Sequence, residues 1–272
     1  MGSTGWWVYK VNTMEEMLGV KIDSLTVNEA LNKVAGFFVN GKHNTIFTPN
    51  PEMLVDASRD QYFKDVLNSG DLNISDGFGV SLVSFGKIKR ITGVDFVFRL
   101  CELAQEENKS IYLVGSGSRK VLEKTVENLK KQFPKLKIVG FHSGPKIDFL
   151  LVDDKQTIVP EPEINDQAIH EIIMTAPDIL LVAFGHNKQE KWIYENIKNL
   201  PSVKVAMGVG GTFDFIAGFN SMRQTVKRAP CFMRKIGLEW LYRLCLQPRR
   251  FTRIWKATGM FVGLYIYNKF KR

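Results

Sequence analysis

The chain has 272 residues, of which 44% are hydrophobic, and this is enough for one large α/β domain or a domain with an appendage. No run of about 18 apolar residues occurs and no secretory signal is visible, so we expect neither a membrane-spanning helix nor a leader peptide. The three cysteines form no CxxC pair and no Cys/His cluster. This pattern excludes a disulfide framework and a structural zinc site and indicates a reducing compartment.

Positive charge is concentrated at the C-terminal end. Residues 223–272 hold 13 of the 37 lysines and arginines but only one of the 28 acids, a net charge of +12. The first 222 residues hold the other 24 bases and 27 acids, a net charge of −3. The tail is also rich in aromatic rings: Phe232, Trp240, Tyr242, Phe251, Trp255, Phe261, Tyr265, Tyr267 and Phe270. Bases interleaved with such rings suit an anionic membrane surface, a phosphate-bearing ligand or nucleic acid.

The N-terminal part alternates between predicted helices and short strands. Residues 1–16 show no clear periodicity. Thr26 and Glu29 have the spacing of a capping box, and the apolar residues that follow recur at helical spacing. We predict buried strands at 45–48 and 71–74, with a helical stretch after the prolines at 49 and 51.

The second part continues this alternation and predicts parallel strands with right-handed crossovers. The predicted strands are 111–114, 136–139, 178–184 and 203–207. The strand at 178–184 is an almost unbroken apolar run, which is typical of a strand buried on both faces. Long helices are expected up to about 131 and over 189–199, whereas 142–165 is predicted to be a loop because it contains three prolines and several acids.

After Arg228 the pattern becomes entirely helical, and Pro248 divides the tail into two segments. We therefore predict a Rossmann-like α/β fold, with a parallel-sheet core, helices on both faces and a helical basic C-terminal appendage. The expected domains are an N-terminal extension at 1–17, an α/β core at 18–222 and a helical appendage at 223–272.

Three glycine-rich turns follow predicted strands: SDGFG at 75–79, GSGS at 115–118 and GVGGT at 208–212. Parallel sheets place ligands at the carboxyl ends of their strands, where glycine lets the backbone approach phosphate. Each turn alone is weak evidence, since such turns are common in α/β proteins. The second turn lacks the full GxGxxG spacing and no GxxxxGK[ST] occurs, which disfavours dinucleotide redox chemistry and P-loop hydrolysis.

Asp76 lies at the end of a predicted strand just before a glycine. It is either a general base in a cleft or an ordinary turn or capping aspartate. Thr48 and Asn50 end the neighbouring strand and either share that cleft or form a polar turn before proline. The chain contains no Asp-x-Asp, and its four histidines show no metal-ligand spacing, so we expect no metal site and no cofactor.

Taken together, these segments resemble the WecG/TagA/CpsF family of bacterial glycosyltransferases, glycosyltransferase family 26, over about residues 18–256. The matching stretches are TPNPE at 48–52, ISDGFGV at 74–80, RITGVD at 90–95, IYLVG at 111–115, FG at 184–185, KQEKW at 188–192, GVGGTFD at 208–214, VKRAP at 226–230 and GLEWLYRL at 237–244. The chain departs from the family pattern by extra length near 143–164 and 219–224.

The resemblance implies inverting transfer of a sugar from a UDP-sugar to a polyprenyl-diphosphate-linked acceptor, on the cytoplasmic face of the cell membrane. The best-studied members transfer N-acetylmannosamine onto N-acetylglucosamine-diphospho-undecaprenol in wall teichoic acid synthesis. By resemblance, Asp76 is the catalytic base and Thr48 the polar residue beside it. The implied substrate-binding residues are Asn50, Gly77, Gly79, Arg90, Asp95, Gly115, Gly185, Gln189, Glu190, Gly210, Gly211 and the tail arginines Arg243, Arg249, Arg250 and Arg253.

Other classes remain open at this point. The same fold could use another UDP-sugar, such as a uronate or glucose, and a basic tail also suits a non-catalytic peripheral membrane protein. Against nucleic acid stand the mildly acidic first 222 residues and the lack of a nucleic-acid motif. The expected partners are therefore the UDP-sugar, the lipid-linked acceptor and an anionic membrane, with a homo-oligomer possible.

Overall fold

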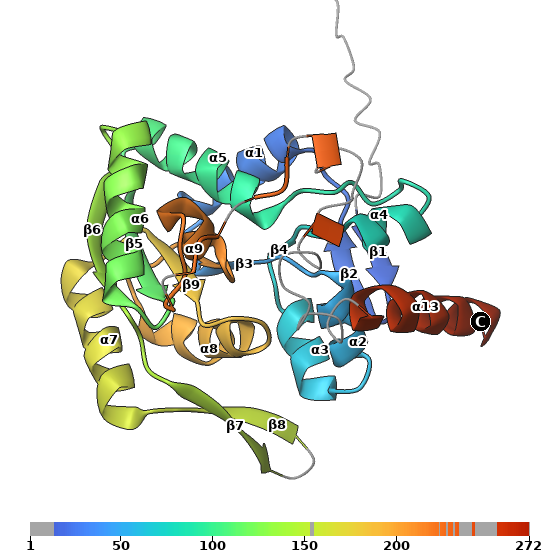
Figure 1. The fold of residues 1–272 in the computed structure, drawn as a ribbon. Coiled ribbons are helices and arrows are strands. Elements are labelled where there is room, and N and C mark those ends of the chain that lie inside the picture. Colours follow the sequence, from blue (N-terminus) through green and yellow to red (C-terminus); the bar gives the residue numbers. More distant parts are fainter. Residues whose placement is uncertain are drawn as a thin grey trace, which may run out of the picture.

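Figure 1 shows the fold as a computed structural model. The structure describes residues 14–152, 155–222, 224–226, 228–230, 232–233, 241–242 and 255–271. Almost all of the predicted core lies within these ranges. Most of the predicted appendage lies outside them, including its division at Pro248.

A six-stranded sheet forms the centre of the molecule (Figure 1), and all of its strand pairs are parallel. The strands are β3 (Asn44–Phe47), β4 (Leu72–Asn73), β5 (Ser110–Gly115), β6 (Lys137–His142), β9 (Ile179–Ala183) and β10 (Val205–Gly208), in the order β4-β3-β10-β9-β5-β6. The predicted α/β fold with a parallel sheet is confirmed. Because the strands are parallel, all their carboxyl ends lie along one edge of the sheet.

Helices cover both faces of this sheet, as predicted. One face packs against α1 (Val27–Phe37), α5 (Gly93–Glu106), α6 (Arg119–Gln132) and α9 (Thr212–Ala217). The other packs against α2 (Pro51–Ala57), α3 (Gln61–Asn68), α7 (Pro162–Thr175) and α8 (Lys188–Asn196), which the short 3-10 helix η1 (Ile197–Asn199) extends. Along β9 alternate residues enter the two cores, and all five are buried, which confirms the prediction for this strand.

Two local features at the N-terminal end follow from the sequence in different ways. The capping box of Thr26 and Glu29 is present at the start of α1. By contrast, β1 (Met14–Met17) and β2 (Val20–Asp23) form an antiparallel hairpin in a segment with no predicted structure. Leu18 and Gly19 both have positive φ in its two-residue turn, the geometry that matches the twist of paired strands.

The prediction of a loop at 142–165 is wrong. β7 (Ile147–Val152) and β8 (Lys155–Pro160) form an antiparallel hairpin outside the main sheet, at the lower edge of Figure 1. The prolines misled the prediction because they border the strands instead of interrupting them. Pro160 is the last residue of β8, where a missing backbone donor costs little.

The described end of the tail is helical, as predicted. A π-helical stretch, η3 (Lys256–Met260), continues directly into α13 (Phe261–Lys271). Both contact α2, and α13 also contacts α4 (Phe78–Val83), the short helix that follows β4. Phe261 is completely buried in this contact, so the end of the tail packs against α2 and α4.

Candidate active site at the carboxyl edge of the sheet

Asp76 and Thr48 extend two neighbouring strands, β4 and β3. The backbone N–H of Ile74 donates to the Phe47 carbonyl and that of Asp76 to the Pro49 carbonyl, so the two strand ends stay parallel beyond the sheet. Both side chains reach Gly93, the first residue of α5. A Cβ at Gly93 would lie 3.1 Å from Asp76 Oδ2 and 3.7 Å from Thr48 Cγ2. The structure therefore brings these two predicted residues together at one point, next to a helix N-terminus.

This environment suits a carboxylate that must stay charged and be reachable. Asp76 and Thr48 are both partly exposed, whereas the neighbouring Ser75 is buried. The positive end of the α5 dipole favours negative charge at Asp76. A partly exposed carboxylate at a sheet edge can accept a proton from a bound alcohol.

Asn50, Gly77 and Gly79 have structural tasks beside this point. The Asn50 side chain accepts a hydrogen bond from the Met53 N–H and so caps α2. A Cβ at Gly77 would lie 2.5 Å from Pro51 Cδ, and one at Gly79 would lie 3.2 Å from Pro51 Cγ. These residues let α4 pack closely on the start of α2, which holds Asp76 in place. Direct contact with a substrate stays a prediction for all three.

Arg90 and Asp95 connect this point to the start of the tail. The Ile91 N–H donates to the Ser75 carbonyl, which places Arg90 alongside the strand end that carries Asp76. Asp95, in the first turn of α5, accepts two hydrogen bonds from the Arg228 guanidinium at 2.6 and 3.1 Å. The VKRAP stretch is thereby joined to the same helix terminus that faces Asp76.

The other predicted glycines gather at the ends of β5, β9 and β10. They line a pocket of about 340 Å³, whose walls include Ser116, Gly117, Phe184, Gly185, Gly210 and Gly211. Gly185 and Gly210 have positive φ and no atom within 4 Å of a Cβ position, so backbone is exposed to the pocket there. Gly115 has a different role, because a Cβ on it would lie 2.6 Å from the backbone of Ala183.

Gln189 and Glu190 support the wall of this pocket. The buried Gln189 side chain accepts a hydrogen bond from the Gly210 N–H at 2.9 Å and donates to Glu190 Oε1 at 2.7 Å. Burial raises the pKa of Glu190 above its ordinary value, although neighbouring donors oppose the shift. The pair joins the start of α8 to the turn after β10, so these two predicted residues position the pocket wall.

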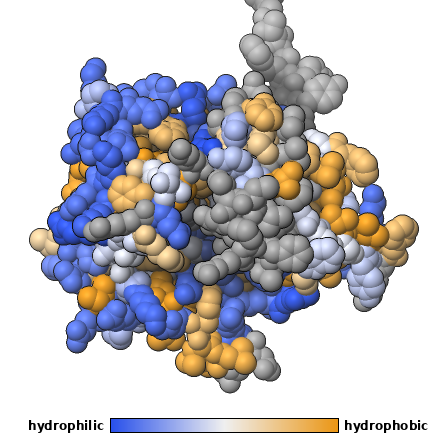
Figure 2. All heavy atoms as spheres, viewed as in Figure 1, coloured by the Kyte–Doolittle hydropathy of each residue, from blue (hydrophilic) through white to orange (hydrophobic). Residues whose placement is uncertain are grey.

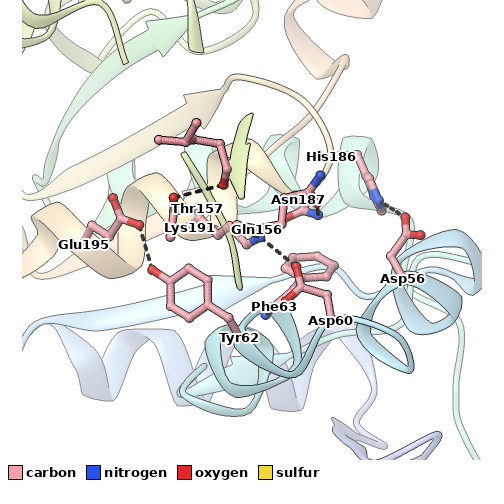
Figure 3. A network of polar contacts seen from close by, with 11 residues as sticks. Asp56, Asp60, Tyr62, Phe63, Gln156, Thr157, His186, Asn187, Lys191 and Glu195 are labelled. Atoms are coloured by element: carbon pink, nitrogen blue, oxygen red, sulfur yellow. Dashed lines mark hydrogen bonds and ion pairs between the residues drawn. The ribbon is translucent and has the colours of Figure 1, made fainter. Parts of the chain in front are cut away.

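Sequence reasoning missed a second pocket, of about 450 Å³, beside the end of α2. Its walls include Asp56, Arg59, Asp60, Gln156, His186, Asn187 and Lys256. His186, in the loop after β9, lies 2.6 Å from the Asp56 carboxylate, which also pairs with Lys256 of η3. Figure 3 shows this contact beside a second one, in which the fully buried Lys191 reaches Asp60 at 2.8 Å.

The partners of Asp56 affect the charge of this second pocket. Burial raises the pKa of Asp56, but hydrogen bonds from His186 and Lys256 outweigh it and hold that pKa below its ordinary value. No local pattern could have predicted the contact, since His186 is 130 residues from Asp56. The contact ties α2, the loop after β9 and the tail together.

Comparison with known proteins identifies the family of this chain. The family model described as "Glycosyl transferase WecG/TagA/CpsF family" matches residues 15–272. The chain belongs to the WecG/TagA/CpsF family. It is therefore a glycosyltransferase, and the resemblance seen in its motifs is confirmed.

Two relatives of this family member carry the same name, N-acetylglucosaminyldiphosphoundecaprenol N-acetyl-beta-D-mannosaminyltransferase. One, from Bacillus spizizenii, is 34% identical over 213 residues, which cover 77% of this chain and 74% of the relative. The other, from Staphylococcus aureus, is 27% identical over 264 residues, which cover 94% of this chain and 93% of the relative.

The remaining predictions for this WecG/TagA/CpsF family member concern the tail and metals. Arg243, Arg249, Arg250 and Arg253 lie outside the described residues. Within the described ranges, no group of three or more His, Cys, Asp or Glu side chains could hold a metal ion. None of the helices in those ranges is long and apolar enough to cross a membrane.

Proposed function

We propose that this chain transfers N-acetylmannosamine from a UDP-sugar to N-acetylglucosamine-diphospho-undecaprenol, with inversion at the anomeric carbon, in cell-wall polysaccharide synthesis. The family and the shared name of both relatives support this assignment of acceptor and sugar. The UDP donor and the inversion rest on the resemblance in the motifs.

The observation that carries the proposal is the meeting of Asp76 and Thr48 at the N-terminus of α5. A proton acceptor is needed because a sugar hydroxyl is a poor nucleophile until its proton is removed. Neighbouring strands lie about 4.8 Å apart, so the ends of β4 and β10, two strands apart, are separated by about 10 Å. A nucleotide-sugar can span the distance between the acid and the glycine-lined pocket.

In the proposed mechanism the acceptor hydroxyl lies beside Asp76. Its oxygen attacks the anomeric carbon while Asp76 takes its proton. The bond from that carbon to the UDP oxygen breaks on the opposite face, and UDP leaves with the electron pair. The new glycosidic bond therefore has the inverted configuration.

The donor diphosphate is proposed to lie against the exposed backbone of Gly185, Gly210 and Gly211. Positive charge from Arg243, Arg249, Arg250 and Arg253 would stabilise the charge that develops on leaving UDP. Since the chain has no Asp-x-Asp and twelve net positive charges in its tail, we propose that transfer requires no divalent metal.

Replacing Asp76 by Asn tests this function. We expect Asp76→Asn to keep the melting temperature and the calorimetric affinity for UDP, and to lower turnover about 10²-fold or more, because the proton acceptor is lost. The control is Asp166→Asn, which removes the same charge from an exposed position on α7 and should leave turnover unchanged. Near-normal turnover in Asp76→Asn would remove this residue from the mechanism.

The donor is tested by a panel of UDP-sugars with a short-chain diphosphate-lipid acceptor. UDP-N-acetylmannosamine should be used in preference to UDP-glucose or a UDP-uronate. Preference for UDP-glucose or a UDP-uronate would leave the proposed mechanism in place but change the sugar that is transferred. No turnover of any donor, together with intact vesicle binding, would favour a non-catalytic membrane protein.

A further inference from the structure

The β7–β8 hairpin lies outside the main sheet, and its strand β7 is apolar although it is exposed. β8 contacts α3 and α8, whereas β7 packs chiefly on β8. Figure 2 shows apolar side chains gathered at the lower edge of the molecule, where Figure 1 places the hairpin. The exposed apolar residues of β7 are Phe149, Leu150, Leu151 and Val152. An apolar strand at the edge of a sheet is a template for pairing with another strand.

The backbone of β7 shows which hydrogen-bonding groups are open to such a partner. In an antiparallel pair, successive residues point their N–H and C=O groups alternately toward the neighbouring strand and away from it. The N–H of Glu161, just after β8, donates to the Lys146 carbonyl, so the even-numbered residues from 146 to 152 face β8. Phe149 and Leu151 therefore face away from it. Among the described residues, no hydrogen bond reaches the backbone groups of these two.

These open groups match those of a second copy of the same strand. If two copies of β7 lie antiparallel with Leu150 opposite Leu150, Phe149 of each copy stands opposite Leu151 of the other. Each such pair exchanges two hydrogen bonds, so four bonds use all the open groups of both strands. A shift of register in one direction would need the Ile147 carbonyl, which already accepts from Lys188. A shift in the other direction would reach past the end of β7.

The side chains and charges of the hairpin fit the same register. Over 149–151, apolar residues of one copy stand opposite apolar residues of the other. Asp148 stands opposite Val152 of the second copy, and Val152 is in turn paired with Lys155 in β8. Asp148 and Lys155 are both exposed. Each end of the contact therefore has an acid from one copy and a base from the other on the same face, where opposite charges attract.

We propose that this protein forms a symmetric dimer in which β7 pairs with β7 of a second copy. The contact is isologous, because the same strand serves both subunits, and it joins two hairpins into one four-stranded sheet. An anionic bilayer is a poorer occupant of this edge, because residues 147–154 contain three acids and no base. The inference is independent of the proposed function, since it uses no residue of the proposed catalytic site.

The mass of the full-length protein in solution tests the dimer. In sedimentation equilibrium without lipid, at high salt and over a range of concentrations, the wild type should reach twice the monomer mass of 31.0 kDa. Leu151→Pro removes an outward N–H and no bond to β8, so the hairpin should persist. We expect the dissociation constant of the dimer to rise about tenfold or more, because two of the four hydrogen bonds are lost.

Leu151→Lys gives a second test that leaves the backbone unchanged, and it should also weaken the dimer because like charges would approach each other. Its matched control is Met174→Lys, which places the same charge at a similarly exposed apolar position of α7 and should not weaken it. Thermal melting shows that each variant is folded. The proposal is overturned if the wild type stays monomeric, or if neither Leu151 variant weakens the dimer.

Cross-linking tests the register. With Cys231 and Cys245 replaced by Ser, only the buried Cys101 remains. Leu150→Cys should then form a disulfide-linked dimer on oxidation, because directly opposite residues of this kind have Cα atoms about 4.5 Å apart. Val159→Cys, on the same face of β8, should not.

Equal cross-linking of the two cysteine variants, or none in either, would also overturn the proposal. None of these measurements uses turnover. Failure of the proposed function would therefore appear separately, in the assay of Asp76→Asn.

Discussion

At the scale of single residues, Gly93 controls the position of the acid. It is the first residue of α5, and its missing side chain is what lets Asp76 Oδ2 lie 3.1 Å from the Cβ position. Few real Cβ contacts are that short, so any side chain would displace the carboxylate by a few tenths of an ångström. The backbone does not require glycine there, because its φ is not positive.

Gly93→Ala should therefore damage catalysis more than folding. We expect turnover to fall about tenfold or more, because the Asp76 carboxylate is no longer correctly placed against the acceptor hydroxyl. The melting temperature should change little. Turnover and thermal melting are measured on the same preparation. Gly36→Ala, in an open position of α1, is the matched control and should be neutral or slightly stabilising. Unchanged turnover in Gly93→Ala would show that Asp76 tolerates displacement.

At the scale of elements, α2 links the two pockets. Its N-terminus, capped by Asn50, lies beside the strand end that carries Asp76, and its last turn carries Asp56. Asp56 pairs with His186 from the loop after β9 and with Lys256 from η3. One carboxylate thus fastens the end of the tail to the core.

Asp56→Asn should loosen this connection. At pH 7 we expect a loss of about 1–3 kcal/mol of unfolding free energy, because charged hydrogen bonds are lost in a partly buried site. The folded pKa of Asp56 is depressed, so its stabilisation is fully present above the ordinary value of 3.8 and is lost as pH falls through the lower folded value. The difference between wild type and variant should stay constant from pH 7 to 5 and narrow below about 4.

Urea unfolding at several pH values measures this difference. Asp65→Asn, at an exposed position of α3, is the control and should have little effect at any pH. A difference that is already lost near pH 6 would contradict the assignment of this pH dependence to Asp56.

At the scale of the whole molecule, charge is divided between a slightly acidic body and a strongly basic tail. With this asymmetry, we expect the tail to face an anionic surface. Each base near such a surface contributes about 1 kcal/mol, so even a few contacts give measurable attachment. Electrostatic attachment of this kind depends on salt, because ions screen exposed charges.

Charge reversal at Lys269, Lys271 and Arg272 tests the electrostatic part. We expect much weaker sedimentation with anionic vesicles at low salt, a smaller difference at high salt, and normal turnover on a soluble acceptor. Reversal of Lys120, Lys130 and Lys135, exposed bases outside the tail, changes the net charge equally and should have less effect. Equal losses of vesicle binding in both variants would mean that binding depends on the net charge of the protein and not on the position of the bases.

The sequence by itself determined the features that depend on neighbours in the chain. Buried strands such as β9, the capping box of α1, the glycine turns and the tail charge all have signatures within a few residues, because strand and helix periodicities are local. The order of its motifs also identified the family. β1 and the β7–β8 hairpin were not predicted, because β1 has no clear pattern and β7–β8 is bordered by prolines.

Only the tertiary structure decided which distant residues meet. Asp76 and Thr48 converge on Gly93, Arg228 pairs with Asp95 across 133 residues, and His186 pairs with Asp56 across 130. Such contacts depend on the strand order and on helix packing, and they leave no periodic trace in either partner. For the same reason the sequence could name Asn50, Gly77 and Gly79 as site residues but could not show that they cap and pack α2 and α4. The positive φ of Phe85, +52°, likewise became visible only in the structure.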